Sequence, residues 1–317
     1  MSNWVQNAGY GQAIMSSLPL LGSGKVFVVG DSGTANRDML VQLFGTDVDG
    51  AVRFHATIDA AIGACTADAG DVILVMPGHT EALTATSIAL DVAGVSIIGM
   101  GQGLDRPTLT CAATGSTITV TGANCRVEGL HFSATVDNVA AAVTLGAAKD
   151  FTLKNCTFDD TGAALHFVSI VVTGATDQAA EGLRVLGNTW NGLAVAPNAF
   201  VSILAASDRV KINDNKVFMD ATNDVGHFVT LAAKIVLEFE CMRNFCIVVG
   251  ATDATVGVFL TGSGTTSKGI VADNRCASLD TTTELMFTAG TGLKFFDNTY
   301  TGVADKSGYV LPAIDAA

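Results

Sequence analysis

Basic residues are scarce in this sequence: its 17 lysines and arginines are outnumbered by 30 aspartates and glutamates, which gives a formal net charge of −13. Proteins that bind nucleic acid through its phosphates need the opposite balance, so we expect no nucleic-acid partner. Long apolar runs are also missing, and without about eighteen consecutive apolar residues a membrane-spanning helix is not expected. The N-terminus has no basic segment followed by an apolar one, so we expect no secretory signal and synthesis in a cytoplasm.

Cysteine pairs with metal-ligand spacing are absent too, because none of the seven cysteines forms a CxxC motif. We therefore expect buried free thiols and no metal or other cofactor. Aromatic residues make up only 7% of the chain, whereas sugar-binding grooves commonly use aromatic rings for stacking. Apolar residues nevertheless form 49% of the 317 residues, enough for a large core. This content excludes a disordered chain and a small disulfide-stapled domain.

A repeated frame of eight residues is the dominant pattern of the chain. Positions one and three of the frame are apolar and position five is a turn former, which is typical of an alternating β-strand followed by a corner. The frame occurs eight times at spacings of 24 to 32 residues, starting at residues 95, 125, 151, 183, 210, 239, 269 and 293. The pattern predicts an all-β solenoid, with coils of fixed cross-section and loops of varying length.

The turn of the frame contains two informative columns. Position five is glycine, asparagine or aspartate in seven of the eight copies, Arg243 being the exception, and these residues tolerate the left-handed backbone of a tight corner. Position six is asparagine in the last five copies. Because equivalent residues of stacked coils lie above one another, we expect their side-chain amides to bond along the stack. This predicted asparagine ladder comprises Asn188, Asn215, Asn244, Asn274 and Asn298.

The segment 54–80 precedes the first frame and has a distinct order of features. A short amphipathic helix is expected over 57–64, followed by Gly70-Asp71, an apolar strand over 72–75 and Pro77-Gly78. This order resembles the start of the right-handed parallel β-helix proteins, the pectin-lyase-like group that includes phage tailspikes. The resemblance implies that the helix caps a β-helix of about nine coils, which forms one domain over 54–317. Residues 1–53 are then an extended N-terminal arm and a lead-in to the cap.

Relatives in this group include polysaccharide lyases and hydrolases, so acidic clusters are candidate catalytic sites. The candidates are Asp159 and Asp160, directly after one frame, and Asp253; Gly226-His227 resembles a histidine motif of the pectin hydrolases. The other motifs of those hydrolases do not occur together here, and the five histidines are scattered over different coils. We therefore expect no enzymatic activity and assign no catalytic residue.

Positions two and four of the frame are predicted to face solvent. Upstream copies of the frame have charged residues at these positions, whereas downstream copies have apolar residues. Because contiguous apolar patches on a protein surface mark interfaces, we expect the downstream residues to contact another chain. The column predicted to be a subunit interface comprises Leu186, Met242, Ile270, Ala272 and Phe296. Solenoids of this kind in phages commonly pack about a threefold axis, so the resemblance implies a homotrimer.

The features together resemble the β-helix virion proteins of tailed phages. The main hypothesis is a capsid decoration or cement protein on the capsid surface, which stabilises the head by binding the major capsid protein. The alternative is a tail spike or fibre module that binds or cleaves a host surface polysaccharide. A third reading, a secreted pectin-lyase-like enzyme, is disfavoured by the missing signal and motifs.

Overall fold

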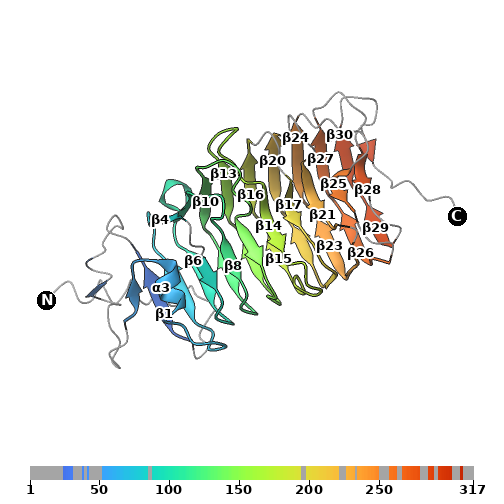
Figure 1. Ribbon diagram of the computed structural model, residues 1–317. Helices are drawn as coiled ribbons and strands as arrows, with labels where there is room; N and C mark the ends of the chain where they lie inside the picture. The colour runs from blue at the N-terminus through green and yellow to red at the C-terminus, as the bar shows by residue number, and fades with distance from the viewer. Residues whose placement is uncertain are drawn as a thin grey trace, which may run out of the picture.

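The computed structural model describes residues 24–30, 38, 41–42, 52–84, 88–193, 198–220, 226–232, 234–249, 257–262, 266–278, 285–288, 292–301 and 308–309. Over these residues the chain is an elongated stack of parallel strands with almost no helix (Figure 1). The all-β solenoid that the repeat predicts is therefore confirmed.

Three long sheets run along the solenoid, and each complete coil adds one strand to each of them. In the described residues, the eleven-stranded sheet consists of β2 (Phe54–His55), β1 (Val26–Val29), β3 (Val72–Val75), β6 (Ser96–Gly99), β9 (Arg126–Glu128), β12 (Thr152–Lys154), β15 (Arg184–Leu186), β19 (Lys211–Asn213), β23 (Phe239–Met242), β26 (Gly269–Ala272) and β29 (Leu293–Phe296). The ten-stranded sheet consists of β4 (Thr80–Leu83), β7 (Thr108–Cys111), β10 (His131–Ala134), β13 (Thr157–Asp160), β16 (Thr189–Gly192), β20 (Lys216–Asp220), β24 (Phe245–Val249), β27 (Arg275–Ser278), β30 (Thr299–Thr301) and β31 (Gly308–Tyr309). The eight-stranded sheet consists of β5 (Ile88–Leu90), β8 (Ile118–Val120), β11 (Val143–Leu145), β14 (Ser169–Thr173), β17 (Ala199–Ser202), β21 (His227–Thr230), β25 (Gly257–Thr261) and β28 (Leu285–Thr288).

The number of complete coils follows from the eight-stranded sheet. Eight coils in the described residues have all three strands, and β29 with β30 begins a ninth. Two short strands, β18 (Ser207–Asp208) and β22 (Val236–Leu237), pair separately at one corner. All neighbouring strands of the three long sheets run parallel, apart from β31, which pairs antiparallel with β30.

The core fills the interior of the coils because the strands alternate between inward and outward side chains. Positions one and three of the frames point inward, and equivalent side chains stack from coil to coil. Aromatic rings make the clearest stack: Phe228 lies between Phe200 and Phe259, with ring centroids 5.3 and 4.6 Å apart. Parallel, in-register pairing produces such columns, since each coil repeats the side-chain direction of the previous one.

Two left-handed corners enclose each central strand of the eleven-stranded sheet. The first is position five of the frame, where Gly129, Asn155, Gly187, Asp214, Arg243, Asp273 and Asp297 have positive φ. The second directly precedes position one, where Gly94, Asn124, Asp150, Gly182, Arg209 and Glu238 have positive φ. A left-handed residue turns the chain sharply within one position, although it costs a non-glycine residue about 1–2 kcal/mol. Only the first corner is predicted by the repeated frame.

The N-terminal part of the solenoid contains the short helix α3 (Ile58–Ile62), shorter than the helix expected over 57–64. The hydroxyl of Thr57 accepts a hydrogen bond from the Ala60 N–H and so caps the first turn. Ile58, Ala61 and Ile62 are buried, and α3 contacts β1, β2, β3 and β5. Strand β1 lies within the segment assigned to the arm and pairs in parallel with β3.

Candidate functional site

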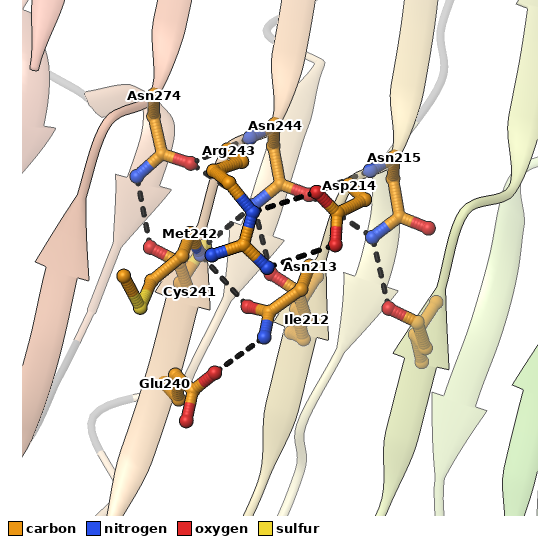
Figure 2. Close-up of polar contacts among 11 residues, drawn as sticks. Ile212, Asn213, Asp214, Asn215, Glu240, Cys241, Met242, Arg243, Asn244 and Asn274 are labelled. Carbon is orange, nitrogen blue, oxygen red and sulfur yellow. Dashed lines mark hydrogen bonds and ion pairs between the residues drawn. The ribbon is translucent and has the colours of Figure 1, made fainter.

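The asparagines at position six lie in one column at the corner between the eleven-stranded and ten-stranded sheets. Figure 2 shows Asn215, Asn244 and Asn274, the middle of this column. Asn244 is representative: its Oδ1 accepts hydrogen bonds from the backbone N–H of Asn215 at 2.9 Å and from the Asn215 Nδ2 at 3.0 Å. Its own Nδ2 donates to the Ile212 carbonyl at 2.7 Å and to the Asn274 Oδ1 at 3.0 Å. Each side chain thus links its coil to both neighbouring coils.

The same pattern connects all five asparagines from Asn188 to Asn298. Upstream, the backbone N–H of Cys156 donates to the Asn188 Oδ1 at 2.9 Å, so the column begins one coil below the first asparagine. All five side chains are buried. Because their donors and acceptors are used within the stack, the ladder is a structural element and offers no group to a ligand.

The outward column predicted to be an interface lies on the eleven-stranded sheet. Met242, Ala272 and Phe296 are in register on neighbouring strands, and Ile270 is outward on β26. Phe296 and Ile270 are 54% and 44% exposed, whereas Ala272 is buried. The column is interrupted upstream, because Asn213 lies between Leu186 and Met242.

The two adjacent acids at the end of β13 point to opposite sides of the strand. Asp160 is 5% exposed and accepts hydrogen bonds from the backbone N–H groups of Phe167 at 3.0 Å and Leu193 at 2.8 Å. Burial raises the pKa of Asp160 to about 6, although both backbone donors favour the charged form. Asp160 therefore fixes two loops of neighbouring coils, whereas Asp159 faces outward. The candidate Asp253 lies outside the described residues, and His227 belongs to the eight-stranded sheet.

Asp159 is part of a connected row of side chains on the outer face of the ten-stranded sheet, which we call the polar strip. The polar strip consists of Arg106, His131, Thr157, Asp159 and Asn191. His131 and Thr157 are paired in register on β10 and β13, and Asp159 and Asn191 are paired on β13 and β16. Arg106 lies just before β7, so the strip spans four consecutive coils.

Hydrogen bonds hold the strip in one arrangement. The Arg106 Nη1 donates to the Asn155 carbonyl at 3.1 Å, and the His131 Nδ1 lies 2.9 Å from the Thr157 Oγ1. The Asn191 Nδ2 donates to the Asp159 Oδ1 at 2.6 Å, and the other oxygen of Asp159 lies 3.8 Å from the His131 Nδ1. Cross-strand contacts of this kind fix side-chain rotamers, so the strip is organised before any ligand arrives.

Electrostatics keep the imidazole of the strip neutral. Burial lowers the pKa of His131, nearby Asp159 opposes this shift, and the positive charge of Arg106 adds to it. A neutral imidazole has one donor and one acceptor nitrogen, so His131 can donate a hydrogen bond to a hydroxyl oxygen or accept one from a hydroxyl group. The strip therefore offers a guanidinium, a carboxylate, an amide, a hydroxyl and a neutral imidazole on one surface.

Sequence reasoning did not bring these residues together. The available signal was positional: His131 and Thr157 occupy position seven of their frames, while Asp159 and Asn191 follow two residues later. Position seven holds ordinary residues in most other frames, so the column was not distinctive.

Within the part of the chain that the structure describes, three or more histidine, cysteine, aspartate or glutamate side chains do not gather at a place that could hold a metal ion. None of the described helices has the length and apolar character needed to cross a membrane. Six of the seven cysteines are buried and one, Cys65, is half-buried; all are free thiols.

Comparison with known proteins gives similarity in fold only. No family and no curated protein matches the sequence. The crystal structure of an alginate lyase from Paenibacillus sp. strain FPU-7 is similar at a TM-score of 0.45 and 12% identity, with 88% of this chain and 98% of the lyase covered. A mutant tailspike protein of E. coli bacteriophage HK620 is similar at a TM-score of 0.34 and 14% identity, with 96% of this chain and 70% of the tailspike covered.

The first similarity corrects the expectation that this chain is not an enzyme. That expectation rested on missing motifs of the pectin hydrolases, yet an alginate lyase has a similar fold at only 12% identity. The missing motifs of one enzyme family are no ground for excluding catalysis, because different chemistries occur on one fold.

Proposed function

We propose that this chain is a polysaccharide-binding virion protein of the tail-spike type, and that the polar strip contacts the sugar chain. The proposal rests on one observation, the connected row of polar side chains on the outer face of the ten-stranded sheet. Thr157 contacts both Arg106 and His131, and Asp159 contacts both His131 and Asn191. Two proteins with a similar fold, a phage tailspike and an alginate lyase, are consistent with this choice. Their similarity concerns the fold, so the strip carries the argument.

The chemistry of the strip suits a chain of hydroxyl-bearing rings. Planar side chains such as guanidinium, carboxylate and amide groups bond to neighbouring hydroxyls in pairs, and Arg106, Asp159 and Asn191 supply one of each. Because strands of neighbouring coils lie about 4.8 Å apart, the members of the strip follow one another along the solenoid axis. A polysaccharide lying along that axis would meet a different partner at each of the four coils. Since the side chains are already fixed, less conformational entropy is lost on binding.

Capsid decoration, with the major capsid protein as partner, makes a different prediction. A cement protein binds phage heads through protein contacts, and its head affinity should not depend on the polar strip. The two functions therefore differ in the ligand that binds. A tail-spike protein binds soluble polysaccharide, whereas a cement protein binds undecorated phage heads.

The test measures binding of the purified full chain to host surface polysaccharide by calorimetry, and to phage heads by sedimentation. We expect saturable polysaccharide binding that weakens at least about tenfold in Arg106→Ala and in Asn191→Ala. Lys154→Ala is the matched control, because Lys154 is a partly exposed cation on the neighbouring sheet, ion-paired with Glu128. Equal binding by the strip variants and the control would overturn the proposed site. Binding to heads without binding to polysaccharide would overturn the function.

A further inference from the structure

The outer face of the ten-stranded sheet continues past the polar strip in the same register. Asn191, the last member of the strip, pairs with Phe218 on β20, and Phe218 pairs with Ile247 on β24. In the neighbouring outward row, Lys216 pairs with Phe245. Phe245 is 43% exposed, and Phe218 and Ile247 are half-buried outward residues of the same two strands. We call Phe218, Phe245 and Ile247 the apolar platform.

Backbone hydrogen bonds at the ladder corner hold the platform in place. The N–H of Phe245, directly after the ladder residue Asn244, donates to the Asn215 carbonyl at 2.8 Å. The N–H of Lys216 donates in the same way to the Asn188 carbonyl at 2.8 Å. Strands β20 and β24 therefore begin at fixed positions, and their outward side chains keep the spacing of the coils. Rings held in this way lose little freedom when a ligand covers them.

The platform is small and is bordered by charged side chains. The exposed parts of its three side chains come to roughly 200 Å², whereas a stable protein contact covers about 800 Å² on each partner. On the downstream side, Arg275 pairs in register with Phe245. At the corner toward the eleven-stranded sheet, the Arg243 guanidinium forms two hydrogen bonds with Asp214, as Figure 2 shows. The platform therefore has the size of a short stretch of sugar rings and is too small for a protein interface.

The chemistry around the platform also suits sugar. A sugar ring has polar edges and an apolar face made of C–H groups, and the negative face of an aromatic ring attracts C–H groups stacked on it. The hydroxyl groups at the edges of that sugar need hydrogen-bond partners beside the ring. Asn191 lies next to Phe218, and Lys216 lies next to Phe245, at the places where such partners are needed. A wholly apolar ligand would leave both polar side chains without a use.

We propose that the apolar platform extends the polysaccharide site of the polar strip, and that sugar rings stack on Phe218 and Phe245. This inference rests on the proposed function, because it assigns a second part of the same binding surface. Strip and platform together cover six consecutive coils, from Arg106 before β7 to Phe245 on β24. Five steps of about 4.8 Å make this line about 24 Å long.

The line is open at both ends. Strand β4 precedes it and β27 follows it in the same sheet, so a bound chain can run past either end. The ligand class is therefore an internal segment of a long polysaccharide. Its polar contacts lie at the upstream end of the line, and its stacked rings lie at the downstream end.

Calorimetry of the full chain with purified host surface polysaccharide tests the platform. We expect Phe218→Ala and Phe245→Ala each to weaken binding at least about fivefold, and Phe245→Trp to keep it, since an indole also offers a ring face. Phe296→Ala is the matched control, because Phe296 is a phenylalanine of similar exposure, 54%, on the eleven-stranded sheet. Circular dichroism checks that each variant keeps its β-sheet signal.

Two further measurements locate the sugar on the platform. With oligosaccharides of graded length prepared from the same polysaccharide, we expect affinity to rise until a fragment covers both strip and platform. Phe245→Ala should remove the gain of the longer fragments and leave the affinity of the shortest ones unchanged. In Phe245→Trp, bound polysaccharide should shift the emission of the exposed indole, whereas in Phe296→Trp it should not.

The outcomes separate this inference from the proposed function. Binding that Arg106→Ala weakens but both alanine variants of the platform leave intact would overturn the platform and keep the strip. An equal loss in Phe296→Ala would show a general apolar effect and would also overturn the platform. Failure of the unmodified chain to bind polysaccharide would overturn both proposals, and head binding that is lost in Phe245→Ala would then assign the platform to a protein partner.

Discussion

Replacing the central asparagine of the ladder, Asn244→Ala, should destabilise the protein more than any change at the same corner outside the ladder. The substitution removes both hydrogen bonds that Asn244 accepts from Asn215. It also removes the three that the Asn244 Nδ2 donates, to the Ile212 carbonyl, the Asn274 Oδ1 and the Cys241 Sγ. Asn274 still accepts from the backbone N–H of residue 244. The backbone N–H of Asn215 and the Ile212 carbonyl lose their ladder partners in a buried site.

The magnitude follows from these two groups. A buried polar group that loses its partner costs about 1–3 kcal/mol, so the two together give a loss of about 2–6 kcal/mol in the free energy of unfolding. The small cavity left by the side chain adds to this value. Native domains are stable by only about 5–15 kcal/mol, so the change should be easily measured.

The assay is urea denaturation, followed by circular dichroism and by the fluorescence of the buried Trp190. Asn298→Ala is the first, positive control: it removes the ladder partners of the equivalent backbone groups, the Asn274 N–H and the Val271 carbonyl, so its cost should fall in the same range. Asn191→Ala, at an exposed position on β16, is the second control and should change stability little. If Asn244→Ala costs less than about 1 kcal/mol, or no more than Asn191→Ala, the ladder does not stabilise the stack as described.

Three further predictions concern the corners and the buried acid. Arg243→Gly should leave the free energy of unfolding unchanged or raise it by about 1 kcal/mol. Glycine relieves the left-handed strain at φ 55°, and the ion pair with Asp214 that is lost is half-exposed and weak. A loss above about 1 kcal/mol in urea denaturation would contradict this prediction. Gly182→Ala should cost at least about 1 kcal/mol in the free energy of unfolding, because φ is +71° and the new Cβ would clash with the Asp150 carboxylate. A neutral result in the same assay would refute the assigned corner. The pKa of Asp160 is raised from 3.8 to about 6, so the native state keeps a proton that the unfolded state releases. The contribution of Asp160 to the free energy of unfolding is therefore complete below pH 3.8 and falls by about 3 kcal/mol as the pH rises to about 6. Asp160→Asn should abolish this dependence on pH. An unchanged pH profile in that variant would assign the dependence to other groups.

Several features of the fold could be read from eight-residue segments. Alternation of apolar and polar residues identified the strands and their inward faces, since it depends only on the period of a β-strand. Glycine, asparagine and aspartate at position five marked one left-handed corner, because those residues adopt that backbone most readily. The corner before position one has a weaker sequence signal, since Arg209 and Glu238 adopt positive φ there against their ordinary preference.

The candidate surfaces depended on contacts between coils. Arg106 and Asn191 are 85 residues apart in the chain, yet both belong to one strip, because the loops between frames absorb their unequal lengths and keep the strands in register. Asp159 and Asp160 look like a pair in sequence, but a strand sends adjacent side chains to opposite sides. The sequence by itself therefore determined the coil, its core and its ladder column, which follow from local backbone preferences. Only the tertiary structure decided which outward side chains meet, because that depends on stacking residues from different coils.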